Sequence, residues 1–508
     1  MQTNFDIFHI DNRNIFWYNT VKPTTLCTKR EASCATFHLI LRRMKTMKKT
    51  RIGIAALLIS AMAMSMTACG KESSVYSNPM DSANKDAISE ALGADSQLSD
   101  GLENKTIKWM ATWDINPDGT GKKTPTELEV FQQKYGGIVE YHPVEWETRF
   151  DQLANAINSG EGIDFYPASD LDVFPKGAIK DMFVPIDDYI DFTDPLFAPI
   201  KEAADLFQWK GKHYVIVNDI TGDNCVCIYN RDTFEENGLE DPAKLFAEGK
   251  WDWNKFQEQL QQFVDPENEQ FGIDGWWYEA GLSGTCSVPY IGMKDGKLVN
   301  NMKDPAIERL QNWMYELGTT NCVAIGVGDF GWNAMPNYIG EGKELFHPCG
   351  AWALFDKKQS WAAKFGENAM FVPMPKDPES SEYYIPCGID GYVMVKGGKN
   401  PEGVAKFAAC KRFAITDEVT STVGTEQLAS DYGWTDEMVE MLHKCHELAK
   451  ANPHYDFMNS VSSEISTILD SNDAGGIRAA SKGQYKWSES VSAAYSAINS
   501  FIDQANNS

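Results

Sequence analysis

Residues 210–230 read KGKHYVIVNDITGDNCVCIYN. The segment holds two runs rich in β-branched and aromatic residues, which favour strands. Between them lies Thr221-Gly222-Asp223-Asn224, a composition typical of a turn. The stretch therefore predicts two strands that follow each other closely along the chain.

Upstream of this stretch, apolar residues alternate with a strand period and then with a helix period. The predicted elements are a strand at 106–113, a helix at 126–135, a strand at 138–144, a helix at 146–158 and a strand at 163–166. A strand-helix-strand-helix order of this kind predicts a largely parallel sheet covered by helices.

Downstream, residues 228–239 read IYNRDTFEENGL and residues 249–256 read GKWDWNKF. Further along come FVPMP at 371–375, GIDGY at 388–392 and NPEG at 400–403. The order of these motifs resembles that of bacterial extracellular solute-binding proteins of family 1. These are substrate-binding lipoproteins of ABC transporters and are similar to maltose-binding protein.

This resemblance implies an α/β fold of the periplasmic-binding-protein type, with two lobes and a ligand cleft between them. Each lobe is expected to be discontinuous in sequence. Lobe 1 would comprise residues 104–218 plus 384–430, and lobe 2 residues 219–383 plus 431–508.

The same resemblance implies a function. The chain would capture an extracellular solute, a carbohydrate or oligosaccharide, by lobe closure and present it to ABC permease subunits in the membrane. We expect a monomer that needs no cofactor and catalyses nothing. A short peptide or a polyamine remains open as the ligand, and an exported glycoside hydrolase or a surface adhesin remains the alternative function.

The N-terminal region has the features of an export signal. Residues 44–68 join a basic segment to the apolar run IGIAALLISAMAMSM, which is too short to span a bilayer. Cys69 follows Thr67 and Ala68 as in a lipobox, so we expect Cys69 to be lipidated and to anchor the protein on the extracytoplasmic face of the cell membrane. Residues 69–103 are polar and are expected to form a flexible tether, within which residues 86–92 can form a helix.

The residues before the signal follow no clear period. We expect residues 1–43 to be a non-native upstream extension, with translation starting at Met44 or Met47.

Composition limits the class of partner. The 72 acidic residues exceed the 46 Lys and Arg, and a net charge of −26 repels nucleic acid. Fifteen Trp and 43% hydrophobic residues indicate globular lobes rather than a disordered acidic chain.

Sugar sites combine flat aromatic rings, which cover C–H faces, with short polar side chains that bond hydroxyl groups. Both kinds occur in this chain at predicted strand ends and beside glycine, where the backbone can turn. The predicted ligand-binding residues are Trp113, Asp114, Asp164, Tyr166, Trp276, Trp277, Trp332, Trp352, Asp390 and Tyr392. We assign Trp251 and Trp253 to helix packing instead.

Two weaker patterns were weighed for metal binding. His443 and His446 share a helix face, and residues 265–274 have acidic spacing faintly like a calcium loop but lack its glycine. We expect no metal site at either. Cys225 and Cys227 lie two apart in a predicted strand, a geometry poorly suited to a mutual disulfide. We expect most of the eight cysteines after Cys69 to be buried free thiols.

Overall fold

The computed structural model describes residues 80–93, 97–117, 123–169, 172–275, 277–324, 334–355 and 361–508. The predicted signal segment of residues 44–68 and Cys69 lie outside them. Within the described ranges, no helix combines the length and the apolar character that crossing a membrane requires.

Lobe 1 is built on a five-stranded sheet. Its strands, in spatial order, are β2 (Ile138–Pro143), β1 (Thr106–Ala111), β3 (Phe165–Pro167), β13 (Gly388–Met394) and β6 (Val215–Thr221). Strand β1 pairs in parallel with β2 and β3, which confirms the parallel start predicted from the sequence. Strand β13 returns antiparallel between β3 and β6.

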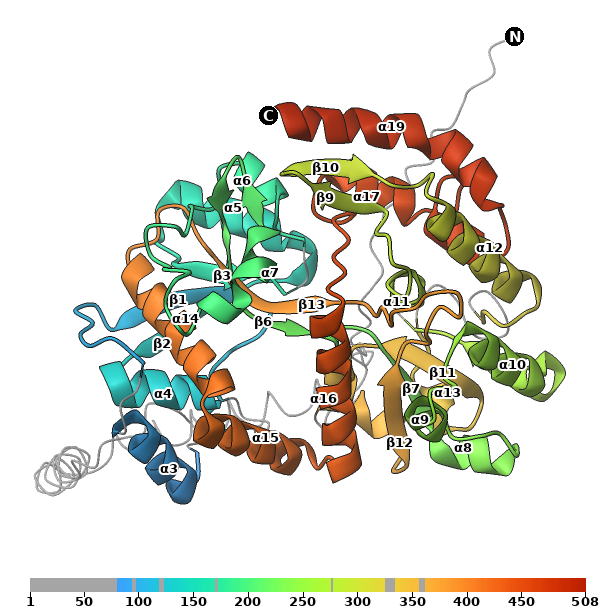
Figure 1. Cartoon of the computed structure of the whole chain (residues 1–508), viewed down its shortest axis with the longest axis horizontal. Helices are drawn as coiled ribbons and strands as arrows, with labels where there is room; N and C mark the ends of the chain where they lie inside the picture. The colour runs from blue at the N-terminus through green and yellow to red at the C-terminus, as the bar shows by residue number, and fades with distance from the viewer. Residues whose placement is uncertain are drawn as a thin grey trace, which may run out of the picture. The chain divides into compact units, whose positions relative to one another are not determined.

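Helices cover this sheet and close its core. They include α4 (Thr126–Tyr135), α5 (Arg149–Ser159), α7 (Lys201–Asp205) and α14 (Pro401–Thr416), and α15 (Glu418–Tyr432) packs on α14 and α4. Phe407 on α14 lies at the centre, with its ring 5.3 Å from that of Phe131 and 5.8 Å from those of Phe165 and Tyr392. The helix therefore joins α4 to strands that are far apart in the sequence (Figure 1).

One segment differs from the flexible tether expected for residues 69–103. Residues 82–93 form helix α3 (Ser82–Gly93), which packs against α4 and α15. Ile88 and Leu98 are buried, and Lys85 forms an ion pair of 3.4 Å with Glu129. A few well-placed apolar residues are enough to dock an otherwise polar segment, so residues from 80 onward belong to lobe 1.

Lobe 2 contains a four-stranded sheet. Its strands, in spatial order, are β12 (Ala369–Pro373), β7 (Val226–Asn230), β11 (Glu344–Cys349) and β8 (Phe271–Ile273). Strand β7 pairs antiparallel with β12 and β11, and β11 pairs in parallel with β8.

The helices of lobe 2 fix its core. They include α8 (Arg231–Glu236), α9 (Pro242–Ala247), α10 (Trp253–Phe263), α11 (Tyr278–Ser283), α12 (Pro305–Thr319) and α13 (Asn337–Gly340). Trp251 and Trp253 are buried, and Trp253 stacks on Trp313 at 4.6 Å. The Nε1–H of Trp251 donates to the carbonyl of Pro373 at 2.8 Å. This confirms the packing role predicted for the two tryptophans.

The C-terminal part of the chain packs mainly on lobe 2. It comprises α17 (Ser463–Leu469), α18 (Ile477–Ser481) and α19 (Trp487–Asn507). Helix α18 contacts α12. Helix α19 contacts the hairpin that is formed by β9 (Ile291–Lys294) and β10 (Lys297–Asn300).

The chain crosses between the two sheets more than once. Residues 222–225 connect β6 to β7, and residues 374–387 connect β12 back to β13. Helix α16 (Asp436–Ala451) contacts both β6 and β12, so it lies along the junction (Figure 1). The first connection, residues 222–225, is called the crossing below.

Candidate functional site

Two of the predicted tryptophans lie together where strands of lobe 2 end. Trp277 follows β8, and Trp352 lies in the short 3₁₀ turn that follows β11. Their indole rings are 6.2 Å apart and nearly perpendicular. Strands β8 and β11 are parallel, so these residues share the carboxyl edge at which α/β sheets commonly bind ligands.

A third indole extends this pair. Trp361 lies 6.1 Å from Trp352, and its ring is half-buried. Trp277, Trp352 and Trp361 together are called the tryptophan cluster below. The sequence did not single out Trp361, because no glycine stands next to it to mark a turn.

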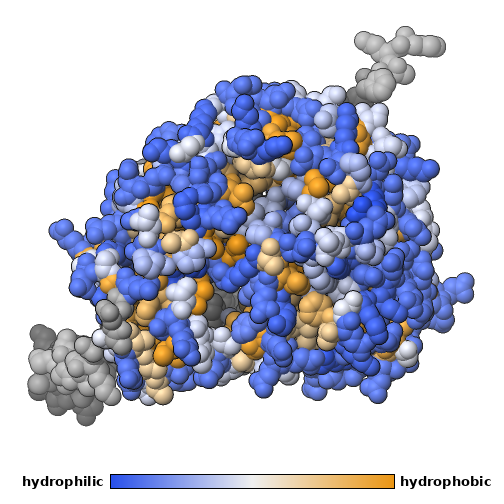
Figure 2. All heavy atoms as spheres, viewed as in Figure 1, coloured by the Kyte–Doolittle hydropathy of each residue, from blue (hydrophilic) through white to orange (hydrophobic). Residues whose placement is uncertain are grey.

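The tryptophan cluster is exposed to an unusual degree. Few large apolar side chains of the described residues are more than a third exposed, and they include Trp277 at 37% and Trp352 at 38%. Tryptophan is generally well buried, so a pair of exposed indoles suits contact with a ligand. Figure 2 shows a mostly hydrophilic face with apolar side chains in several separate patches.

Backbone contacts hold the cluster against the crossing. The N–H of Ala351 donates to the carbonyl of Asp223 at 3.0 Å, and the thiol of Cys225 lies 3.8 Å from the carbonyl of Trp277. Gly350 lets the indole of Trp352 fold back over the main chain, since a Cβ at Gly350 would lie 2.1 Å from Nε1 of Trp352. Any movement of the lobes about the crossing would therefore involve the cluster.

Trp113 is the exposed aromatic of lobe 1. It follows the end of β1 and is 40% exposed. Its ring meets that of buried Trp109 edge-on at 5.8 Å, and its carbonyl accepts the Nε1–H of Trp109 at 3.0 Å. The next residue, Asp114, is half-buried and accepts two hydrogen bonds from Asn116 at 2.9 Å. Both residues remain candidates for ligand contact from lobe 1.

Asp164 has a different environment from the one predicted. It is buried, and its carboxylate accepts the backbone N–H groups of Lys108 at 2.8 Å, Lys399 at 2.6 Å and Asn400 at 2.7 Å. These bonds tie β1 to the start of α14. The carboxylate is thus occupied in holding lobe 1 together, and we do not carry it into the proposed site.

The three predicted residues on β3 and β13 also lie within lobe 1. Tyr166 and Tyr392 are buried, and the ring of Tyr392 packs edge-on against that of Phe165 at 5.4 Å. Asp390 is half-buried and forms an ion pair of 3.2 Å with Lys411. The structure therefore places the two tyrosines in the core. Trp276 and Trp332 lie outside the described residues.

Helix α16 brings ionisable groups to the junction between the lobes. Lys450 pairs with Asp219 at 2.8 Å, and His446 accepts the N–H of Gly222. Burial lowers the pKa of His446, while the carboxylates of Asp223 and Asp219 act in the opposite direction.

The sequence and the fold were compared with those of known proteins. The family of bacterial extracellular solute-binding proteins matches residues 128–427, more than half of the 508-residue chain. A maltotriose-binding protein of Pyrococcus abyssi is 25% identical over 342 residues. The match covers 63% of this chain and 66% of that protein, so the chain spans just under two thirds of this relative.

Solved structures share the fold at low sequence identity. An ABC substrate-binding protein of Listeria monocytogenes, in complex with cycloalternan, has a TM-score of 0.54 and 16% identity, over 79% of this chain and 97% of that chain. The galacto-N-biose/lacto-N-biose I-binding protein of Bifidobacterium longum, in complex with lacto-N-biose, has a TM-score of 0.53 and 14% identity, over 79% and 99% of the two chains.

These likenesses establish the two-lobed α/β fold of substrate-binding proteins. The family match agrees with the resemblance found in the sequence motifs and covers most of lobe 1 and lobe 2. The chain therefore belongs to the bacterial extracellular solute-binding proteins, a family that binds solutes outside the cytoplasm.

Proposed function

We propose that this protein captures a carbohydrate, most simply an oligosaccharide, for an ABC importer. The observation that carries the proposal is the tryptophan cluster, in which the exposed Trp277 and Trp352 stand at the carboxyl edge of β8 and β11 beside the crossing and the half-buried Trp361 adjoins Trp352. Flat indoles cover the C–H faces of pyranose rings, and several of them in a row suit a ligand of more than one sugar. The relatives that are named for a sugar or were solved in complex with one support the same class of ligand.

Lobe 1 would complete the site from the opposite side. We propose that Trp113 and Asp114 contact the ligand when the lobes close, with Asp114 bonding sugar hydroxyl groups. Closure about the crossing would bring the two lobes onto one ligand, and the closed form would be the one that permease subunits recognise.

For the division of the chain we retain residues 104–218 plus 384–430 as lobe 1 and 219–383 plus 431–508 as lobe 2, with residues 80–103 added to lobe 1.

We further propose that the chain acts as a monomer without catalysis and is held at the membrane by a lipid on Cys69. A glycosidase would require two carboxyl groups about 5–10 Å apart across the bound sugar. At the lobe junction, the carboxylate of Asp219 is paired with Lys450 at 2.8 Å.

A ligand screen tests the proposal. Residues 70–508 are heated with mono- and oligosaccharides, polyamines and short peptides, and the unfolding temperature is recorded. We expect saturable stabilisation by one class of sugar. Chromatography of the incubated ligand should show no cleavage. Stabilisation by peptides or polyamines alone, or hydrolysis of the sugar, would refute the proposal.

A further inference from the structure

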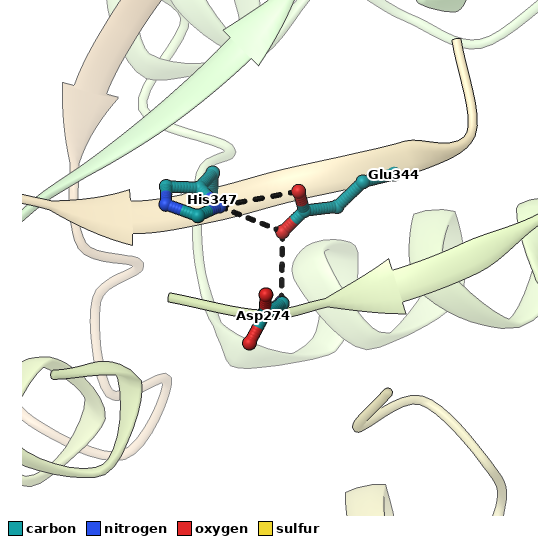
Figure 3. Close-up of side chains that lie close together, drawn as sticks. All are labelled: Asp274, Glu344 and His347. Carbon is teal, nitrogen blue, oxygen red and sulfur yellow. Dashed lines mark hydrogen bonds and ion pairs between the residues drawn. The ribbon is translucent and has the colours of Figure 1, made fainter. Parts of the chain in front are cut away.

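Three ionisable side chains meet inside lobe 2, away from its surface. Asp274 follows the end of β8, and Glu344 and His347 lie on β11 (Figure 3). All three are fully buried, with no exposed area. One ligand atom from each lies within 4.8 Å of the others, and no other such group of three occurs in the described residues.

The three side chains share few hydrogen bonds. Nδ1 of His347 lies 3.0 and 3.1 Å from the two carboxylate oxygens of Glu344, and Oε1 of Glu344 accepts the N–H of Asp274 at 3.0 Å. Oδ2 of Asp274 accepts the N–H of Met335 at 2.7 Å. Oδ1 of Asp274 and Nε2 of His347 are buried with no hydrogen-bond partner.

This arrangement lacks a charge that would balance it. Two carboxyl groups are removed from water beside one imidazole, and among the described residues neither carboxyl forms an ion pair with a Lys or Arg. Burying charged groups is costly unless they are paired, coordinate a metal or are neutralised by a proton. An unpartnered carboxylate oxygen such as Oδ1 of Asp274 is the kind of atom that a cation would satisfy.

We propose that Asp274, Glu344 and His347 bind one divalent transition-metal ion of the zinc class inside lobe 2. Two carboxylate oxygens and one imidazole nitrogen are donors that zinc accepts, and its double charge would neutralise both carboxylates. Calcium fits less well, because it requires six to eight oxygen ligands and does not favour imidazole.

The geometry requires only a small adjustment. Zinc bonds to nitrogen and oxygen at about 2.0–2.2 Å, so tetrahedral ligands stand about 3.4 Å apart. The present ligand atoms lie within 4.8 Å of one another, and rotation of the carboxyl groups can close the difference. His347 would bind through Nδ1, the nitrogen that lies beside the Glu344 carboxylate, and keep its proton on Nε2.

The ion would tie together the two strands that lead into the tryptophan cluster. Trp277 comes shortly after Asp274, and Trp352 comes shortly after His347. The ring of His347 also lies 6.2 Å from that of Trp361. A bound metal would therefore fix the bases of the segments that carry the cluster.

Metal analysis tests the inference without any sugar. The full-length chain is purified from zinc-containing medium, and its metal content is measured by inductively coupled plasma mass spectrometry. We expect about one zinc per chain, a lower unfolding temperature after removal by a chelator, and recovery when Zn²⁺ is added. Less than about a tenth of an equivalent, with no effect of chelator or Zn²⁺ on unfolding, would overturn the inference and leave a shared proton as the neutralising charge.

Matched variants and a crystal locate the ion. We expect His347→Gln to lower zinc affinity at least tenfold and His454→Gln, at a buried histidine elsewhere, to leave it unchanged. If His347→Gln does not fold, anomalous scattering at the zinc edge from wild-type crystals decides the matter. A peak among Asp274, Glu344 and His347 supports the site, whereas a peak only at His443 and His446 or elsewhere refutes it.

Discussion

The backbone N–H of Gly222 donates a hydrogen bond of 3.0 Å to Nδ1 of His446. Gly222 begins the crossing, and His446 lies on α16, so the bond attaches this helix to the segment that joins the two sheets. An imidazole nitrogen accepts only when it carries no proton. The attachment therefore depends both on the absence of a side chain at residue 222 and on a neutral histidine.

The close contact at Gly222 predicts the effect of adding a methyl group. A Cβ there would lie 2.1 Å from the carbonyl oxygen of Cys445, so Gly222→Ala must push α16 away from the crossing. We expect a loss of about 1–3 kcal/mol in the free energy of unfolding, measured by urea denaturation. Gly93→Ala, where nothing lies within 4 Å, is the control and should cost less than about 0.5 kcal/mol. Equal stability of the two variants would contradict the packing described.

The bond to His446 predicts a dependence of stability on pH. Burial lowers the pKa of His446 below 6.5, with Lys450 and His443 adding to the effect and Asp223 and Asp219 opposing it. The unfolded chain then binds the proton more readily than the folded one, so this group destabilises the fold as the pH falls below 6.5 and contributes no penalty above it.

The variant His446→Asn isolates this contribution. The Asn side-chain oxygen can accept the N–H of Gly222 and does not titrate. We expect the free energy of unfolding to fall less between pH 7.5 and pH 5.5 in His446→Asn than in the wild type. His443→Asn, at an exposed position of the same helix, should retain most of the wild-type slope, because His443 contributes less to the lowered pKa of His446 than burial does. An unchanged slope in His446→Asn would show that its proton is not involved.

The cysteines predict a simple chemical result. The eight after Cys69 are all free and buried, as expected from the sequence, and burial raises the pKa of Cys349 and Cys387 to about 12. Thiolates react and thiols do not, so native residues 70–508 should react slowly with a thiol reagent and fully after unfolding. Eight reactive groups in denaturant are expected, and six would reveal a disulfide.

Lipidation at Cys69 is tested in cells. We expect the protein to be found in the membrane fraction and to incorporate labelled fatty acid, and Cys69→Ser to abolish both, because a thioether at this residue is the attachment that a lipobox implies. Cys225→Ser, at a buried thiol of the folded part, should remain in the membrane fraction. Labelled fatty acid on the Cys69→Ser protein would refute the assignment.

Much of the fold could be predicted because its signals are local. The alternation in residues 106–166 predicted parallel strands separated by helices, and the motifs around Trp251 and Trp253 predicted a family whose architecture the structure shares. These features depend on residue periods and on short motifs, both of which are visible in the sequence.

The site was harder to predict because it depends on distant contacts. Nothing near Asp164 in the sequence shows that amides of Lys108, Lys399 and Asn400 converge on it. The short strand β3 has too few residues for alternation to show which face Tyr166 takes, and the structure buries it.

The contact between Glu344 and His347 could not have been predicted from spacing either. Residues three apart on a strand normally point to opposite faces of the sheet. In this structure the Glu344 side chain, at the first residue of β11, reaches His347 at 3.0 Å. The metal-ligand patterns visible in the sequence, His443 with His446 and the acidic residues of 265–274, therefore give no connection between Asp274 and β11.

The central claim is that the tryptophan cluster binds the sugar, and titration calorimetry of paired variants tests it most directly. The oligosaccharide that stabilises residues 70–508 most is titrated into the wild type, Trp352→Ala and Trp146→Ala. Trp352 and Trp146 are both 38% exposed, but Trp146 lies outside the cluster under the guanidinium of Arg149 at 3.8 Å. We predict that Trp352→Ala weakens binding by roughly tenfold or more, about 1.4 kcal/mol, and that Trp146→Ala binds as the wild type does. Equal affinity of Trp352→Ala and the wild type would contradict the account.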